Sequence, residues 1–438
     1  MLAVVFRGPC GMAGPHAPAW PARNEVLAQV SPSPAPAPAR PQKLPAPRVL
    51  PCLLLALFVA AARLCAAPGA ALVAAGLLYT NERVGEPPWS IHLVQVPRSN
   101  SLYELHSLHA RGRALGLEPL SAQVALLKPA LGKPAAALNG DFYVRDKAYA
   151  GAPRGLQIME GEVLSAPSGG PCFWLDVLGE PHVTNVVSRF QVTWPDGTPT
   201  PFRLNGERKT NGVELYTSAA GASTHTVGGR ELVLERQPGH LWLPLRIGHT
   251  YVARVREIRS GGNTPLAPDI LVLSLGPAIM GRFLNVNTGA VLQLSTASVP
   301  ALLGARTALS GGPVLVRDGK RQKIRASPTD SYELASMVER HPRSAIGWNK
   351  QSFFLLEVDG RQRDLSVGMT LEELSNHLLK LGCQEVLNLD GGGSATLWCE
   401  GEVRNSPCDG YERPIANCLV VVRKAVKYDG QAKAHIPK

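Results

Sequence analysis

SFFLLEVDGRQRDLSVGMTLEELSNHLLKLGCQEVLNLDGGGSATL, residues 352–397, is the stretch that decides the fold class of this chain. Its middle, TLEELSNHLLKLG (370–382), repeats leucine at helical spacing, opens with the capping-box pair Thr370 and Glu373, and ends at a glycine. The apolar runs on either side, SFFLLEVDG (352–360) and CQEVLNLDG (383–391), predict two strands. A strand, helix, strand unit usually lays its strands parallel and leaves the loop after the second strand at an exposed sheet edge. The stretch therefore predicts that DGGGS (390–394) lies at such an edge.

The rest of the chain consists mainly of short apolar runs separated by turn signals, which predict strands. A second helix is predicted for SAQVALLKPALG (121–132), leading into the strand AAALNGDFYV. Residues 172–300 read as all-β, with a long polar excursion at 204–229, and we interpret them as an insertion. The predicted fold class is α/β (α+β): a mixed β-sheet core with few helices and a β-rich inserted segment.

The N-terminal part has a different composition from the rest of the 438 residues. Residues 1–48 offer little to bury, and within them the segment 31–48 alternates proline with alanine or serine, which predicts a disordered, Pro/Ala-rich extension. The apolar run at 49–67 follows basic residues and ends in small ones, as in a signal peptide. An uncleaved anchor is the alternative, but Arg63 and Pro51 leave a run that is too short to cross a membrane. The folded domain is expected at 76–425 and a basic tail at 426–438.

Charge and cysteine content argue against nucleic-acid binding and against a zinc site. Of the net charge of +11, six basic residues and one glutamate in residues 1–67 account for +5, so +6 remains on the mature chain. No basic helix with interleaved aromatics occurs, which argues against nucleic acid. Five cysteines lie beyond the leader, and none forms a CxxC pair, which argues against a zinc site. In an exported protein, Cys399 and Cys408 could form one disulfide.

Four polar turns each flank an apolar strand: LNGDFY (138–143), LSGGPVLVRDG (309–319), ERHPRSAIGWN (339–349) and LNLDGGGSATL (387–397). Glycine after a strand permits positive φ and lets a ligand approach main-chain N–H groups, which can hold an anion. A guanidinium at Arg343, beside Ser344, is well suited to grip a phosphate. No P-loop ending, G-x-S-x-G elbow or H-E-x-x-H helix accompanies these turns.

Each of these features also has a structural explanation. The glycine run can be a tight hairpin that Asp390 caps, and Asn139 and Asn388 can satisfy buried backbone groups. Arg343 can form a salt bridge to a neighbouring acid. The capping box explains Glu373 without any function.

Taken in order, NGDFY, SGGPVLVRDG, HPRSAIGW, VDGRQ, GMTLEEL, NLDGGGSATLW and RPIANCLVV resemble the phosphodiester glycosidase family, over roughly residues 76–425. The resemblance implies an exported α/β hydrolase that cleaves the bond between a sugar's anomeric carbon and a phosphodiester. No cofactor is expected, and a divalent metal stays open as the alternative. The proline-rich extension and the basic charge are more typical of a bacterial envelope protein than of an animal lysosomal one. The expected partner is therefore a sugar phosphodiester or phosphate-bearing glycan, in the periplasm or cell envelope, with membrane contact only through an uncleaved leader.

The resemblance also implies roles for the residues of the four turns. Asp390 is the expected catalytic carboxylate and Asp141 its partner. The expected substrate-binding residues, which hold the phosphate or the sugar, are Arg343, Asn139, Ser310, Gly311, Gly312, Asn388, Gly391, Gly392, Gly393 and Ser394.

Two alternatives stay open on the sequence alone. Asp141, Asp390 and His341 could ligate a divalent metal in a phosphodiesterase. The chain could instead be a non-catalytic envelope protein that binds anionic glycans, because most glycine-rich turns catalyse nothing.

Overall fold

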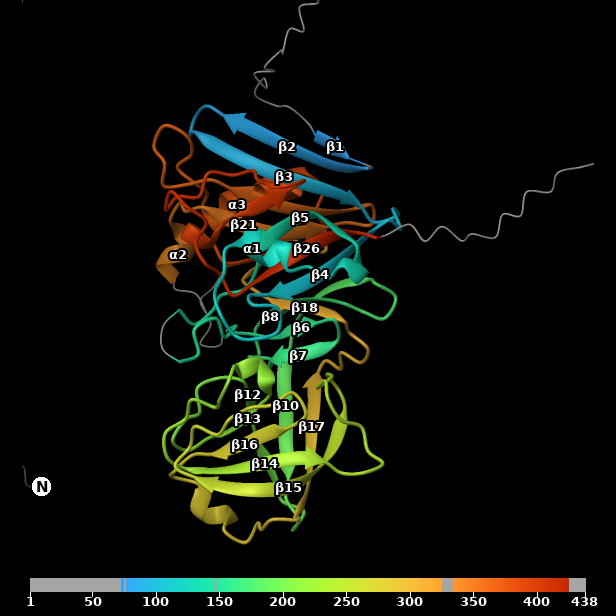
Figure 1. Cartoon of the computed structure of the whole chain (residues 1–438). Helices are drawn as coiled ribbons and strands as arrows, with labels where there is room; N and C mark the ends of the chain where they lie inside the picture. The colour runs from blue at the N-terminus through green and yellow to red at the C-terminus, as the bar shows by residue number, and fades with distance from the viewer. Residues whose placement is uncertain (1–71, 75, 146–147, 325–333, 425–438) are drawn as a thin grey trace, which may run out of the picture. The chain divides into compact units, whose positions relative to one another are not determined.

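The fold is described by a computed structural model that covers residues 72–74, 76–145, 148–324 and 334–424 (Figure 1). The predicted extension (1–48), leader (49–67) and basic tail (426–438) lie outside these residues. The described residues all belong to one compact unit. The described residues are rich in strands and contain few helices, so the predicted fold class is confirmed.

The sheet that carries most of the candidate site, here called the major sheet, has eight strands. In spatial order they are β1 (Leu72–Ala74), β2 (Leu77–Val84), β3 (Trp89–Pro97), β22 (Ser352–Val358), β21 (Arg343–Trp348), β23 (Glu385–Asn388), β19 (Val314–Arg317) and β20 (Lys320–Arg321). β22 and β23 both run antiparallel to β21, which lies between them. They are therefore parallel to each other, as the strand, helix, strand pattern predicts.

Helix α3 (Leu371–Lys380) connects these two strands and forms as its sequence predicts. Thr370 accepts a hydrogen bond from the Glu373 N–H, and the Glu373 carboxylate accepts one from the Thr370 N–H, which completes the capping box. The helix buries Leu371, Leu374 and Leu378 against one face of β22 and β23. Because β22 is covered on both faces, its apolar run is continuous rather than alternating.

Two five-stranded sheets complete the domain around the site. The β5 sheet contains β25 (Glu402–Val403), β24 (Leu397–Cys399), β5 (Lys133–Asn139), β26 (Asn417–Arg423) and β4 (Tyr103–His109). The β18 sheet contains β7 (Glu162–Ser165), β6 (Gln157–Met159), β18 (Thr307–Ser310), β8 (Pro171–Leu175) and β9 (Pro181–Asn185). Side chains of all three sheets share one hydrophobic core, to which Leu138, Leu309 and Leu387 contribute.

A second eight-stranded sheet, the inserted sheet, lies between residues 187 and 299. Its spatial order is β11 (Pro199–Pro201), β10 (Val187–Thr193), β17 (Val291–Val299), β15 (Thr250–Ser260), β14 (Arg230–Arg236), β16 (Leu271–Leu275), β13 (Val213–Tyr216) and β12 (Arg203–Leu204). The predicted polar excursion at 204–229 contains the buried strand β13, so it is not one continuous loop. β8 and β9, which the sequence groups with the insertion, pair instead within the β18 sheet.

The remaining helices are short: α1 (Leu120–Ala125), α2 (Leu334–Val338) and the 3₁₀ turns η1 (Pro129–Leu131), η2 (Ser218–Ala220), η3 (Met280–Phe283) and η4 (Gly392–Ser394). The predicted helix at 121–132 therefore ends early. Proline disfavours helical backbone at the residue before it, and Pro129 follows Lys128, which is extended.

The predicted disulfide between Cys399 and Cys408 is wrong, because both cysteines are free. Cys399 is buried in β24, where burial raises the pKa of its thiol to about 11. The Cys408 thiol instead donates a hydrogen bond to Asp409 Oδ1 at 3.6 Å.

Candidate active site

The loop after β23 carries Asp390 into a cavity of about 320 Å³. The Asp390 N–H donates to the Gly140 carbonyl at 3.0 Å, so the loop is joined to the turn after β5. Asp390 Oδ1 accepts from the Gly391 N–H at 3.0 Å. Burial raises the pKa of the Asp390 carboxyl to about 6, although the Ser394 hydroxyl and the Arg145 charge act in the opposite direction.

The three glycines of this loop are required by their protein neighbours. A Cβ on Gly391 would lie 2.6 Å from the Pro342 carbonyl oxygen, and one on Gly393 would overlap the Arg413 guanidinium. Gly392 has φ +61°, in the left-handed region, and donates its N–H to the Pro342 carbonyl at 2.9 Å. The N–H groups of Gly391 and Gly392 are thus occupied by protein oxygens, and the predicted cradle of free amides for phosphate is wrong at these two positions.

Asn139, at the end of β5, connects two sheets beneath this loop. Its Nδ2 donates to the Asp390 carbonyl at 2.6 Å, and its Oδ1 accepts from Ser344 Oγ at 2.6 Å and from the Thr396 N–H at 3.1 Å. The side chain is fully buried. Its polar groups are taken by protein partners, so the prediction that it bonds sugar hydroxyls is not supported, and Asn139 positions Asp390 instead.

Asp141 lies behind Asp390, not on the cavity wall. Its side chain is buried, with Oδ1 accepting from the Phe142 N–H at 2.8 Å and Oδ2 from the Gly155 N–H at 3.0 Å. Burial raises the pKa of Asp141 to about 7, and the negative charge of Asp390 adds to this rise. The charge of Asp390 therefore acts on the protonation of Asp141.

The SGG turn packs directly against the end of β23. The Gly312 N–H donates to the Asn388 carbonyl at 2.8 Å, and Asn388 Nδ2 donates to the Gly312 carbonyl at 2.7 Å. A Cβ on Gly311 would lie 2.5 Å from the Asn388 carbonyl oxygen. Ser310 is buried beside Gly155, on the side of Asp141. Within this turn, the close packing of backbones explains the glycines.

Four arginines and one carboxylate line the cavity. Its complete lining is Phe142, Arg145, Pro313, Ser336, Met337, His341, Arg343, Arg361, Leu371, Asn388, Leu389, Asp390, Gly391, Gly392, Gly393 and Arg413. All four polar turns predicted from the sequence therefore converge on this cavity, because each contributes a lining residue and Asn139 is hydrogen-bonded to two of the other turns. The surplus of positive charge suits an anionic ligand.

Arg343 is buried within this wall and donates to three backbone carbonyls: Met369 at 2.8 Å, Ser336 at 2.6 Å and Glu339 at 2.7 Å. Burial and the neighbouring charge of Arg361 lower its pKa to about 10, so it stays protonated at neutral pH. Arg343 contributes charge to the cavity, but three of its donated bonds are structural, unlike the predicted bidentate grip on phosphate.

Sequence reasoning missed Arg361, Arg413 and Arg145. Arg361 has φ +60° and contacts His341 Nδ1 at 3.4 Å and Cys408 Sγ at 4.0 Å, with no carboxylate partner among the described residues. Arg413 is held by Asp409 at 2.7 Å. Arg361 and Arg413 lie in motifs that carry the family resemblance, VDGRQ and RPIANC, and that position is the sequence signal that could have identified them.

The alternative metal site is not assembled. His341 Nε2 lies 3.1 Å from Glu339, and burial with the charges of Arg343 and Arg361 lowers its pKa. Across residues 72–424, leaving out the undescribed positions, Asp141, Asp390 and His341 do not gather their ligand atoms in one group.

None of the described helices is long and apolar enough to cross a membrane.

The family model for phosphodiester glycosidases matches residues 268–422. Curated protein sequences give no match. The fold is similar to that of a hypothetical protein from Synechocystis, with a TM-score of 0.65 and 20% identity over 82% of this chain, and this chain covers 64% of that protein. It is also similar to a Burkholderia pseudomallei K96243 protein classed as exported, with a TM-score of 0.58 and 20% identity, over 76% of this chain and 74% of that one. The catalytic domain of zebrafish N-acetylglucosamine-1-phosphodiester alpha-N-acetylglucosaminidase matches at 14% identity over 82% of this chain and 84% of that one, with a TM-score of 0.39.

The family match contains three of the four converging turns, those around Ser310, Arg343 and Asp390. The match confirms, over residues 268–422, the resemblance to the phosphodiester glycosidase family that the sequence motifs predicted.

Proposed function

We propose that this chain hydrolyses the bond between the anomeric carbon of a sugar and the oxygen of a phosphodiester. Water adds to the anomeric carbon, the carbon–oxygen bond breaks, and its electron pair leaves with a phosphate monoester. A phosphate oxygen is a weak base, so its departure needs charge stabilisation more than protonation.

The observation that carries the proposal is the cavity in which Asp390 faces Arg145, Arg343, Arg361 and Arg413. One carboxylate is suited to the developing positive charge at the anomeric carbon, and guanidinium groups are suited to the phosphate. Arg361 and Arg145 are the best placed to bind it, because neither has a carboxylate partner within the described residues. Arg413, which Asp409 holds, can contribute a third charge.

Asp390 is the group that we expect to act, as a base towards water or as the nucleophile. Its pKa of about 6 leaves it ionised at neutral pH, and it lines the cavity. Asp141 is buried, and both of its oxygens accept backbone N–H groups, so we assign it a positioning and electrostatic role.

The test is the release of free sugar from the methyl diester of a sugar 1-phosphate, with the full chain. Asp390→Asn is expected to lower kcat by about 10²- to 10⁴-fold, the usual contribution of a positioned acid or base. Asp364→Asn, at an exposed position, serves as the matched control and should keep wild-type kcat. Unchanged turnover in folded Asp390→Asn would remove Asp390 from the mechanism.

Hydrolysis in ¹⁸O-labelled water identifies the bond that breaks. Label in the released sugar is expected, because water adds to carbon. Label in the phosphate would instead indicate a phosphodiesterase, and saturable binding with no product after long incubation would indicate a glycan-binding protein.

We further propose that the protein is exported and acts on an envelope or surface polymer. The leader-like segment at 49–67 supports export, and so does the exported class of the Burkholderia protein with a similar fold. Recovery of the full-length chain in the cytoplasm of its native cells, with no processed form outside, would contradict this.

A further inference from the structure

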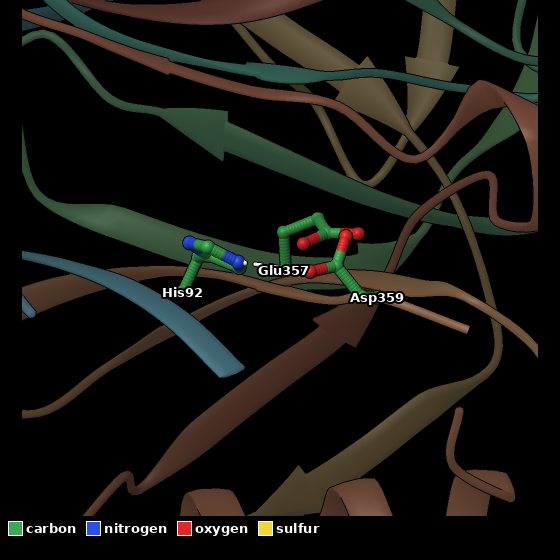
Figure 2. Close-up of side chains that lie close together, drawn as sticks. All are labelled: His92, Glu357 and Asp359. Carbon is green, nitrogen blue, oxygen red and sulfur yellow. Dashed lines mark hydrogen bonds and ion pairs between the residues drawn. The ribbon is translucent and has the colours of Figure 1, made fainter. Parts of the chain in front are cut away.

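Three buried ionisable side chains converge between β3 and β22, and none of them is among the residues that line the cavity. His92 on β3 is the register partner of Glu357 on the antiparallel strand β22, and Asp359 follows at the end of that strand. Their exposed fractions are 3%, 0% and 1%. Figure 2 shows both carboxylates facing the imidazole, and one ligand atom from each residue lies within 4.8 Å of the other two.

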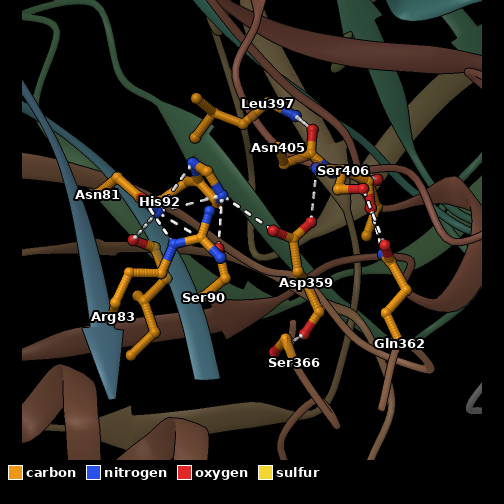
Figure 3. Close-up of polar contacts among 12 residues, drawn as sticks. Asn81, Arg83, Ser90, His92, Asp359, Gln362, Ser366, Leu397, Asn405 and Ser406 are labelled. Carbon is orange, nitrogen blue, oxygen red and sulfur yellow. Dashed lines mark hydrogen bonds and ion pairs between the residues drawn. The ribbon is translucent and has the colours of Figure 1, made fainter. Parts of the chain in front are cut away.

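The charges of this cluster do not balance. Asp359 Oδ2 lies 3.0 Å from His92 Nε2, and its Oδ1 accepts from the Ser406 N–H at 2.7 Å. Within the described residues, neither carboxylate forms an ion pair with lysine or arginine. Arg83, drawn in Figure 3, is exposed and donates to Asn81. One imidazole therefore faces two buried carboxyl groups.

Glu357 is the member of this cluster whose burial its protein neighbours do not explain. Neither of its carboxyl oxygens has a hydrogen-bond partner, although both are buried. The amide of Asn405 lies beside it, but its hydrogen bonds join the Leu397 N–H and the Ala395 carbonyl. Burial, reinforced by Asp359, raises the pKa of Glu357 well above its usual range, although the neighbouring Asn405 amide acts in the opposite direction. Protonation does not remove the difficulty, because the O–H would still lack an acceptor, and an unpaired buried polar group costs about 1–3 kcal/mol.

We propose that His92, Glu357 and Asp359 form a structural site for a divalent first-row transition metal, such as Zn²⁺ or Mn²⁺. An imidazole nitrogen with two carboxylate oxygens is a ligand set that these ions accept, whereas Ca²⁺ and Mg²⁺ favour oxygen alone. A divalent cation neutralises both carboxylates and gives Glu357 a partner. The proposal is independent of the glycosidase activity.

The surroundings of His92 support ligation through Nε2. Tyr79 Oη lies 2.8 Å from Nδ1, so Nδ1–H can donate to it and leave the Nε2 lone pair for the metal. Ser90 Oγ lies 3.0 Å from Nε2 and can supply a further oxygen ligand.

The site would also stabilise the segment that presents Arg361 to the cavity. Asp359 Oδ1 accepts a hydrogen bond from the Ser406 N–H (Figure 3). Gln362 Nε2 donates to the Ser406 carbonyl at 2.7 Å, and the Ser406 hydroxyl donates to Gln362 Oε1 at 2.9 Å. Arg361 lies between Asp359 and Gln362 in the chain. A metal on Asp359 would therefore connect β3, β22 and this turn.

The experiment measures metal content after refolding, because a site this buried is loaded as the chain folds. The full chain is unfolded in guanidinium with chelator, refolded with ZnCl₂, with MnCl₂ or without metal, dialysed against a weak chelator and analysed by mass spectrometry. Wild type should retain about one equivalent of Zn²⁺ or Mn²⁺ per chain, and His92→Gln and Glu357→Gln less than about a tenth. Glu214→Gln, which changes another buried glutamate, one paired with Arg203, should retain the full equivalent.

Two further measurements separate metal loss from misfolding. Glu357→Gln, refolded without metal, should be at least as stable as metal-free wild type, because it removes an unpartnered carboxylate. Tyr79→Phe, which leaves the ligands in place, should weaken metal binding about 10- to 100-fold. Wild type that retains less than a tenth of an equivalent overturns the proposal, and so does a full equivalent retained in Glu357→Gln, which would place the metal elsewhere.

Discussion

Replacement of Asp141 by asparagine tests whether this carboxyl group is buried and protonated in the folded protein. Its pKa rises from 3.8 in the unfolded chain to about 7 after folding. Between these values the folded protein keeps a proton on Asp141 that the unfolded chain has released, so the contribution of Asp141 to stability is largest below pH 4 and is lost as the pH rises towards 7. At 1.36 kcal/mol per pH unit, this rise corresponds to a loss of about 4 kcal/mol.

Asparagine does not titrate, so Asp141→Asn lacks this loss. It has one carbonyl oxygen for the two backbone N–H groups that Asp141 binds, which costs about 1–3 kcal/mol at every pH. We expect the variant to be less stable than wild type at pH 4 and to gain about 4 kcal/mol relative to it by pH 8. The free energies of unfolding come from urea titrations at several pH values.

Asp364→Asn is the control for this experiment, because Asp364 is exposed and its variant should follow the wild-type pH dependence. A difference in stability between Asp141→Asn and wild type that stays constant from pH 4 to pH 8 would refute the reasoning. It would mean that Asp141 is ionised in the folded protein and faces solvent or a cation.

Four further predictions concern the site and its support. The hydrolysis rate should fall as the pH drops through about 6, because Asp390 must be ionised; a rate that rises there would contradict its role as base or nucleophile. Asn139→Ala should lower the free energy of unfolding by about 2–4 kcal/mol and reduce kcat, because it leaves buried groups unpaired; wild-type values of both would contradict its positioning role. Gly393→Ala should displace Arg413 and raise KM about tenfold, which is the effect expected from the loss of one charged contact with the substrate. An unchanged KM would show that Arg413 does not bind substrate. Thr370→Ala should cost about 1 kcal/mol of stability in urea titration and leave kcat/KM unchanged, and no loss of stability would contradict the observed helix cap.

The sequence was most informative where the signals are local. The capping box and leucine spacing of α3 are set by residues within four positions of each other, and the parallel course of β22 and β23 follows from the crossover. The four polar turns were identified because glycine and asparagine after a strand have few local explanations.

The rest depends on contacts between distant segments. Arg343 is next to a serine in sequence, but its partners are the carbonyls of Ser336, Glu339 and Met369, which no local pattern reveals. The pairing of His92 with Glu357 depends on strand register between residues 265 positions apart, and both residues are ordinary members of their apolar runs. The division between the β18 sheet and the inserted sheet likewise depends on which strands pair.

The three hydrogen bonds of Asn139 have a consequence for the thermodynamics of binding. They join β5, β21 and the Asp390 loop before any substrate arrives. The conformational entropy of ordering this loop is therefore lost when the protein folds, and little of it has to be lost again in each catalytic cycle. The loop should show the same order with and without ligand, so differences in affinity between substrates should reflect their contacts with the arginines and not the closing of the loop.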